Sequence, residues 1–242
     1  WALLLAGLIR TFFFQPYWIP SGSMKDTLLI GDFLFVNKMA YGYSKHSCPW
    51  SLCPFSGRII SKEPERGDVV VFKHPTTGAD YIKRLIGLPG EKIQMKDGDL
   101  YINDKVVPVK PDGIFQEINE IQGPMQSSRP ACSKPTSDGS ICVKEKYKSE
   151  LPNGVIHSIL NVSTGQSLDN TGIFSVPPGH YFFIGDNRDN SSDSRVRKPR
   201  GIGFVPFENI VGRADRVMFS SAGKSILYFW TWRSDRYFKA ID

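Results

Sequence analysis

The chain has 242 residues, of which 40% are apolar and 22% are charged, a composition that excludes a disordered protein and suits one large domain or one and a half. Its 22 glycines and 17 prolines favour short strands and turns over a helical bundle. Lysine and arginine exceed aspartate and glutamate by 30 to 24. These cations are dispersed and no aromatic nucleic-acid-reading motif accompanies them, so we predict no nucleic-acid partner.

The N-terminal residues form an apolar stretch, WALLLAGLI, that ends at Arg10 and precedes an aromatic cluster between Phe12 and Trp18. A helix of this length reaches roughly 13 Å, less than the bilayer core of about 30 Å. An arginine followed by aromatic residues is typical of a helix that leaves a bilayer through its interface. We therefore expect residues 1–15 to be the end of a truncated transmembrane anchor, with a buried core helix as the alternative.

Further along the chain, short runs of β-branched and aromatic residues bounded by Gly, Asp or Pro predict strands. These runs lie at 33–37, 68–72, 80–86, 91–95, 100–103, 180–185 and 209–220. The sequence LYINDKVV predicts a hairpin that turns at Asn103-Asp104. The aromatic and basic tail, 221–242, is expected either to pack as a final strand or to contact a membrane surface. The predicted architecture is mostly β.

Four cysteines form two local pairs, Cys48 with Cys53 and Cys132 with Cys142, in loops that contain proline and serine. Such pairs are typical of disulfides formed in an oxidising compartment outside the cytosol. A zinc site that uses all four thiolates is the alternative, but the spacing of the second pair is wider than structural zinc sites use. We therefore expect two disulfides and no metal.

Two segments carry side chains suited to nucleophilic chemistry. In IPSGSMKDTLLIGDFLFVNK, at 19–38, Gly22 stands between two serines and permits a tight turn that can point a hydroxyl outward. In DYIKRLIGLPGEKI, at 80–93, strand alternation places Lys83 on a face with large apolar residues. Burial there favours the neutral amine, so Lys83 can act as a general base near neutral pH. A plain turn and a lysine that lays its stem on the core are the alternatives.

A third segment, GDNRDNSSDSR at 185–195, is dense in aspartate, asparagine and serine. It lacks the glycine and final glutamate of an EF-hand, so a rigid turn held by Asp–Arg pairing is the better interpretation. Such a turn can present the hydroxyl of Ser191 or Ser192 to a neighbouring strand. The four histidines match no metalloprotease motif and no Gly-x-Ser-x-Gly elbow is present, which leaves a Ser–His–Asp triad with little support. No cofactor is predicted.

Taken together and in this order, the segments resemble the bacterial type I signal peptidases, membrane proteases with a Ser–Lys dyad. PSGSM with LLIGDFLFVNKMAYG matches the serine box of that family, RGDVVVFKHP its next box, YIKRLIGLPGE its lysine box and GDNRDNSSDSR its C-terminal box. Asp26 departs from the proline that many members have. The resemblance implies a signal-peptidase-like catalytic β-core at 16–107 and 174–220, with a hairpin extension at 43–62 and an inserted second domain at 108–173.

The resemblance also implies roles for individual residues. Ser23 resembles the nucleophile, and Lys83 resembles its general base. Ser21 resembles the side-chain donor of an oxyanion hole whose other donor is the backbone N–H of Ser23. Ser191 resembles the hydroxyl that positions the lysine amine. Structural support is expected from Arg84, Asp186, Asp193 and Arg195. The pocket for small substrate side chains is expected to involve Ile19, Pro20, Met24, Leu28 and Ile82.

Members of this family remove N-terminal signal peptides from secreted preproteins after A-x-A-type sites. The resemblance therefore implies a monomeric enzyme of the bacterial inner membrane, with its catalytic domain on the periplasmic face and with preproteins and membrane lipid as partners. Two alternatives stay open: a pilin-maturation peptidase of the same family, and an inactive extracytoplasmic β-domain that binds peptides.

Overall fold

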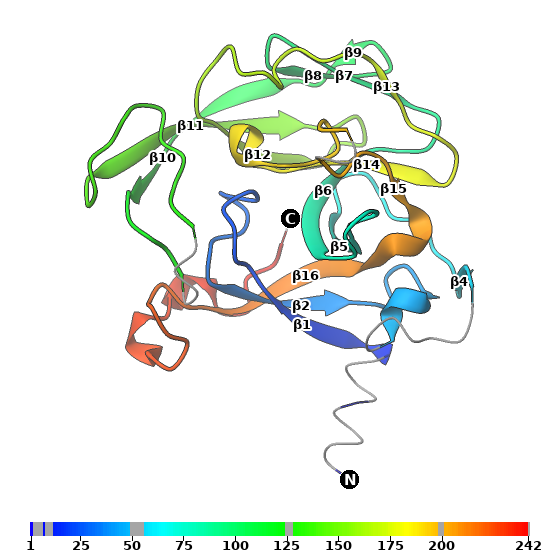
Figure 1. Ribbon diagram of the computed structural model, residues 1–242, viewed down its shortest axis with the longest axis horizontal. Coiled ribbons are helices and arrows are strands. Elements are labelled where there is room, and N and C mark those ends of the chain that lie inside the picture. Colours follow the sequence, from blue (N-terminus) through cyan, green and yellow to red (C-terminus); the bar gives the residue numbers. More distant parts are fainter. Residues whose placement is uncertain (2–6, 8–11, 49–55, 124–127, 198–200, 242) are drawn as a thin grey trace.

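The computed structural model describes the chain except residues 2–6, 8–11, 49–55, 124–127, 198–200 and 242. It is mostly β, as predicted, and its largest sheet has seven strands in the order β1-β2-β16-β5-β6-β14-β15 (Figure 1). Every pairing in this sheet is antiparallel. The strands of this sheet are β1 (Phe14–Trp18), β2 (Asp32–Asn37), β5 (Val69–Lys73), β6 (Asp80–Gly87), β14 (His180–Ile184), β15 (Val205–Pro206) and β16 (Ile210–Ser220).

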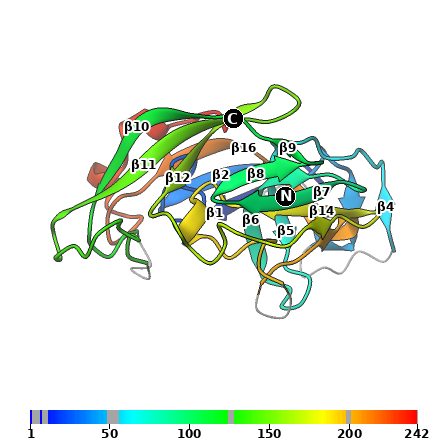
Figure 2. The ribbon, with the colours of Figure 1, turned by 90° about the horizontal axis from the view of Figure 1, so that it is seen from above.

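Three smaller sheets complete the described part of the chain. One pairs β3 (Tyr43–Ser44) with β4 (Arg58–Ile59), and another joins β10 (Val109–Ile118), β11 (Ile141–Glu150) and β12 (Ile156–Asn161). The third has the order β13-β7-β8-β9. Its strands are β7 (Lys92–Lys96), β8 (Asp99–Ile102), β9 (Lys105–Val106) and β13 (Phe174–Ser175). Figure 2 shows the sheet of β10, β11 and β12 toward one end of the molecule.

Short 3₁₀ turns lie between strands and in the C-terminal tail. They are η1 (Lys45–Ser47), η3 (Arg188–Asn190), η4 (Phe207–Asn209), η5 (Phe229–Thr231) and η6 (Ser234–Arg236). Among the described residues, no helix is both long and apolar enough to cross a membrane. Part of the predicted anchor, residues 2–6 and 8–11, lies outside the description, and its last residues, Phe14 and Gln15, belong to β1.

The predicted strands are confirmed, and the reason is their apolar pattern. In β2 the inward residues Leu34 and Val36 alternate with partly exposed ones, as expected for a strand with one face on the core. In β5 both faces are buried, and consecutive apolar residues contribute to two different clusters, Val71 to one and Phe72 to the other. The hairpin between β8 and β9 is also confirmed, since Asn103 and Asp104 take left-handed φ values of 51° and 64°.

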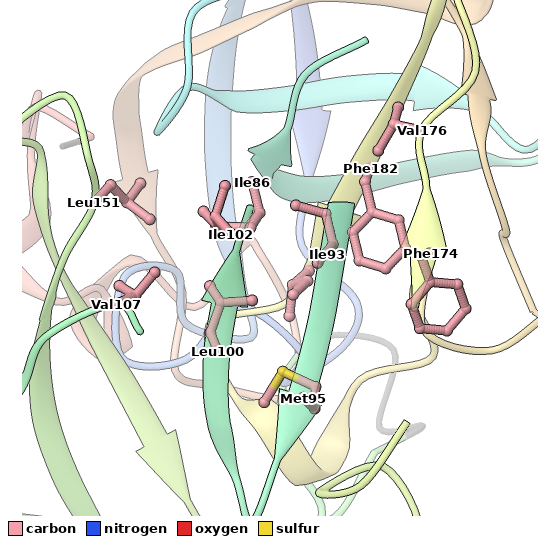
Figure 3. Close-up of a cluster of buried hydrophobic side chains, with 11 residues drawn as sticks. Ile86, Ile93, Met95, Leu100, Ile102, Val107, Leu151, Phe174, Val176 and Phe182 are labelled. Atoms are coloured by element: carbon pink, nitrogen blue, oxygen red, sulfur yellow. The ribbon is translucent and has the colours of Figure 1, made fainter. Parts of the chain in front are cut away.

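A third hydrophobic cluster joins the end of β6 to the sheet of β7, β8 and β13 (Figure 3). Phe182 of β14 packs there against Phe174, with ring centroids 5.1 Å apart. Gly87 ends β6 at this junction, where an added Cβ would lie 2.8 Å from Ile93 and 2.9 Å from Phe182. The lack of a side chain at Gly87 therefore lets the large sheet and the smaller sheet pack closely.

The tail differs from one of its two expected forms. Rather than a final strand, residues 221–241 form η5 and η6. An isolated bridge joins Ala240 to Arg216 of β16, and a second bridge, between Ser221 and Trp232, lies within the tail. Cys132 and Cys142 form a disulfide. Cys48 is also disulfide-bonded, while Cys53, its predicted partner, lies outside the described residues.

Candidate active site

The segment 19–31 forms a loop between β1 and β2, which we call the serine loop because it carries Ser23. Its two ends are held together by backbone hydrogen bonds, from Ile19 N to Asp32 O at 2.8 Å and from Gly31 N to Ile19 O at 3.0 Å. Met24 and Leu28 fix the middle of the loop, since both side chains are fully buried in the cluster that also contains Ile19. The core thereby holds Ser23, which is 7% exposed.

Lys83 reaches the same point from β6. Its Nζ lies 2.6 Å from the Oγ of Ser23 and donates to Ile82 O at 3.0 Å. The lysine is 4% exposed, and burial lowers its pKa to about 8, although Asp193 and Asp186 act in the opposite direction. A minority of the Lys83 side chains therefore carries the neutral amine near pH 7, and this fraction rises to about half near pH 8. Ser21 completes this group, with its Oγ 3.4 Å from that of Ser23.

The segment 185–195 lies behind Ser23. A Cβ on Gly185 would collide with the side chain of Ser191 and would come within 2.6 Å of the Ser23 carbonyl oxygen, so glycine lets this segment approach the serine loop. The Oγ of Ser191 is buried, and the Ser191 side chain helps to lower the pKa of the Asp193 carboxyl. The structure thus brings Ser191 beside Ser23, while the role of its hydroxyl in orienting Lys83 stays a prediction.

Two buried ion pairs hold this segment. Arg84 donates to Asp186 from Nε and Nη2, both at 2.9 Å, and Arg195 donates to Asp193 in the same bidentate way at 2.9 Å. Burial raises the pKa of the Asp186 carboxyl, but the charge and hydrogen bonds of Arg84 outweigh it and the pKa is lowered. The Oγ1 of Thr27, in the serine loop, donates to Asp186 at 2.5 Å. The Arg84–Asp186 pair therefore connects β6, the serine loop and the 185–195 segment, whereas the Arg195–Asp193 pair lies within the segment.

Asn187 is a site residue that nothing in the sequence singled out. Its backbone N–H donates to Ser23 O at 3.0 Å, and its Nδ2 donates to Gly22 O at 2.9 Å. It therefore binds the carbonyl groups on both sides of the Ser23 backbone N–H. The sequence feature that points to Asn187 is its position directly after Asp186 in the polar 185–195 segment.

The C-terminal tail also contacts the serine loop. Arg236 donates from Nε to Asp32 Oδ1 at 2.9 Å and from Nη2 to Thr27 O at 3.0 Å. Arg233 donates to Ile30 O at 3.0 Å. Local sequence pattern does not predict these contacts, because the partners are 203 to 209 positions apart.

A cavity of about 200 Å³ opens beside the serine loop. Residues 17–20 line one wall, and Val71 with residues 80–82 lines the other. Of the predicted pocket residues, Ile19, Pro20 and Ile82 line this cavity, whereas Met24 and Leu28 are buried in the core. Strand β14 pairs with β6 only from Arg84 to Gly87, so among the described strands residues 80–83 pair with β5 alone.

The chain belongs to the signal peptidase family: the family model described as "Signal peptidase, peptidase S26" matches residues 1–219. Signal peptidase I of Rickettsia typhi is 42% identical over 228 residues, which cover 90% of this chain and 77% of the relative. Signal peptidase I of Rickettsia akari is also 42% identical, over 90% of this chain and 76% of the relative.

A solved structure is similar as well. The crystal structure of a signal peptidase I from Enterococcus faecalis V583 is 27% identical and covers 63% of this chain and 97% of its own, with a TM-score of 0.33. A TM-score of this size adds nothing to the family assignment. The family match and the Rickettsia relatives make the chain a peptidase of the signal peptidase family.

Proposed function

We propose that the chain is a membrane-bound serine endopeptidase that removes N-terminal signal peptides from secreted preproteins after A-x-A-type sites, with Ser23 as nucleophile and Lys83 as general base. The observation that carries the proposal is the 2.6 Å separation between Lys83 Nζ and Ser23 Oγ. A serine hydroxyl is a weak nucleophile until a base takes its proton. A buried lysine whose pKa is lowered to about 8 is suited to that task.

In the proposed reaction, Ser23 Oγ attacks the scissile carbonyl while Lys83 Nζ accepts its proton. The oxyanion receives hydrogen bonds from the Ser21 hydroxyl and from the Ser23 N–H, a type of contact worth about 3–4 kcal/mol in other serine proteases. The ammonium of Lys83 then gives its proton to the leaving amine. Water, with Lys83 again as the base, hydrolyses the acyl-enzyme and restores the Ser23 hydroxyl.

The substrate is proposed to bind as an extended strand along residues 80–83 of β6. This stretch has hydrogen-bonding groups on the side that β14 does not cover, and the cavity of about 200 Å³ lies next to it. A cavity of that size, walled by Ile19, Pro20 and Ile82, suits small side chains. Alanine at the first and third positions before the cut therefore fits the site.

We further propose that the enzyme is monomeric, sits at the bacterial inner membrane with the site on the periplasmic face, and contacts lipid. Large apolar side chains are exposed at two places near the chain ends, at Phe12 and Phe13 and again at Leu227, Phe229 and Trp230. Tryptophan is enriched at membrane interfaces, and phenylalanine and leucine are common on the apolar face of segments that lie in the interface. The disulfide-bonded cysteines are in keeping with an oxidising compartment.

The test is cleavage of a peptide with a signal-type A-x-A site by the purified protein in detergent or lipid, with the products identified by mass spectrometry. We expect a cut directly after the second alanine, and no cut by either Ser23→Ala or Lys83→Ala. Cleavage that survives Lys83→Ala would contradict the assignment of the base. A folded wild type that binds the peptide and cuts nothing would instead support the inactive peptide-binding domain.

A further inference from the structure

A cluster of buried charges joins the serine loop to the β10–β11 hairpin. We call it the lysine–glutamate cluster; its members are Lys25, Glu117 and Lys144. Both carboxylate oxygens of Glu117 are used, since Lys25 Nζ binds Oε2 and Lys144 Nζ binds Oε1 at 2.6 Å. Lys25 is 2% exposed and Lys144 is fully buried. Gln122 adds its amide to the cluster, accepting from Lys25 Nζ at 2.7 Å and donating to Glu117 at 2.8 Å.

Stability alone is a poor explanation for this cluster. Two ammonium groups share one carboxylate, so the cluster holds an excess positive charge away from water. Replacing buried ion pairs with well-packed apolar residues is often neutral or stabilising by about 1–4 kcal/mol. Burial lowers the pKa of Lys25, and Glu117 offsets this only in part. A charged group retained at such a cost has its clearest use in fixing a particular geometry.

The geometry that Lys25 fixes is the turn at Gly22. A Cβ built on Gly22 would lie 3.2 Å from Lys25 Cε and 3.5 Å from Lys25 Nζ, so the lysine side chain folds back over this residue. The backbone N–H of Lys25 donates to Gly22 O at 3.2 Å. Gly22 O belongs to the same peptide group as the Ser23 N–H. Lys25 therefore contacts the turn with its backbone and with its side chain.

The hairpin touches the serine loop at two further points. Lys146 of β11 binds Asp26 at 2.8 Å, and Gly123, which follows β10, lies so near Ile30 that an added Cβ would come within 2.6 Å of it. Figure 1 shows the blue serine loop between the green β10–β11 hairpin and the teal strand β6. The loop is thus bound by the hairpin on one side and by Lys83 on the other.

We propose that Lys25 and Glu117 are positioning residues: Glu117 holds Lys25 across Gly22 and thereby fixes the Ser21–Ser23 turn in the geometry that stabilises the oxyanion. This inference rests on the proposed function, because it concerns the donors of that reaction. Neither residue lines the cavity that is proposed to take the substrate side chain. The β10–β11 hairpin acquires a role in catalysis through the serine loop.

The sharpest variant is Lys25→Met. It keeps an unbranched stem over Gly22 and leaves Glu117 and Lys144 as a balanced pair, so the fold should be retained. We expect kcat to fall about tenfold with KM changed less than twofold, because a donor used only in the transition state is displaced. The midpoint of the pH dependence of kcat/KM should not move, since Lys83 is untouched. An unchanged kcat in folded Lys25→Met would overturn the proposal.

The matched control is Lys45→Met, which makes the same chemical change in an exposed ion pair with Glu208. It should leave kcat, KM and the melting temperature unchanged. Parallel assays of Ser23→Ala and Lys83→Ala test the proposed function separately from the positioning role of Lys25. Activity in either of these variants contradicts the proposed function, whereas their inactivity together with a normal Lys25→Met contradicts only the positioning role.

A second set of variants separates positioning from stability. Glu117→Gln should lower kcat as Lys25→Met does, and it also lowers stability because it leaves two buried ammonium groups. Combining Lys25→Met, Glu117→Leu and Lys144→Met replaces the whole cluster with apolar side chains of similar size. We expect this triple variant to regain the melting temperature but not kcat. Recovery of both together would assign the cluster a purely structural role.

Discussion

The serine loop is held from two sides by buried charges, and the two sides are built differently. On the side of residues 185–195, Arg84 and Asp186 form a one-to-one bidentate pair. Arg84 has a third acceptor in Gly67 O at 2.7 Å. On the side of the hairpin, Lys25 and Lys144 share Glu117. A planar guanidinium matches a carboxylate in geometry and in charge, whereas two ammonium groups on one carboxylate match it in neither.

This difference indicates that the two groups of buried charges have different roles. The Arg84–Asp186 pair satisfies its own charges and holds parts of the core together, so its loss should appear mainly in stability. The lysine–glutamate cluster is unbalanced and acts on a single turn, so its loss should appear mainly in kcat. Lys83, the proposed base, is also buried, and it contacts the serine loop at Ser23. Variants in each region can therefore be compared by their changes in the free energy of unfolding and in kcat.

The largest effect is expected for Asp186→Asn. The substitution leaves the fully buried Arg84 without its counter-charge, which costs about 3–5 kcal/mol of unfolding free energy for pairs of this kind. Urea denaturation of the wild type and the variant at pH 7 measures this loss of unfolding free energy. The lowered pKa of Asp186 means that its contribution is present above the unfolded value of about 4 and is lost as the pH falls through the folded value. The difference between wild type and variant should therefore shrink only in acid.

The control for this variant is Asp138→Asn, which removes a carboxylate from the exposed pair with Arg129. Water and salt screen an exposed pair of this kind, so urea denaturation should scarcely detect the change. A loss at Asp186 no larger than the loss at Asp138 would show that the buried guanidinium finds another partner. The expected contribution of the Arg84–Asp186 pair to stability would then be wrong.

A smaller effect of opposite sign is expected for Lys83→Met. Burial lowers the pKa of Lys83 from 10.5 to about 8, so the ammonium form is disfavoured in the folded protein. The corresponding penalty at pH 7 is up to about 3 kcal/mol, and the lost hydrogen bonds to Ser23 and Ile82 reduce the gain on its removal. We therefore expect an inactive variant that is more stable than wild type at pH 7.

The pH dependence identifies the cause of that gain. The unfolded chain binds more protons than the folded chain between about pH 8 and the ordinary lysine value, so the stability of the wild type rises with pH across this window. The advantage of Lys83→Met should disappear by pH 10.5. The same pKa predicts that kcat/KM of the wild type reaches half its plateau near pH 8. A stability difference that is constant with pH would contradict burial of the charge as its cause.

Much of the fold follows from local sequence pattern. Alternating or continuous apolar runs predict β2, β5, β6 and β14, and the Asn103-Asp104 turn is chosen by two residues that tolerate left-handed φ. The structure contains the contact between Ser23 and Lys83 that the motifs predict, while the catalytic roles of both residues stay predictions. Its 2.6 Å geometry depends on the packing of Met24 and Leu28, which periodicity alone does not reveal.

Two long-range interactions at the serine loop, Lys25 with Glu117 and Arg236 with Asp32, could not be predicted from the sequence. Lys25 stands in a polar stretch, SMKDT, that is typical of an exposed lysine. Its burial is decided by Glu117, which lies 92 residues later in a segment without a motif. Arg236 binds Asp32 from 204 residues away, beyond the end of the family match at residue 219. Interactions of this kind depend on which surfaces the whole fold brings together.

The smallest effect on kcat is expected for the double variant Cys132→Ala with Cys142→Ala. The disulfide closes a loop with a sequence separation of 10, and Cys142 lies directly opposite Glu117 in the register of β10 and β11. Removing a link over so short a loop should cost about 2–3 kcal/mol of unfolding free energy. Glu117 keeps its bonds to Lys25 and Lys144, so kcat should stay within twofold of wild type. A tenfold fall in kcat, matching Lys25→Met, would mean that the covalent link rather than the charge cluster sets the position of the hairpin.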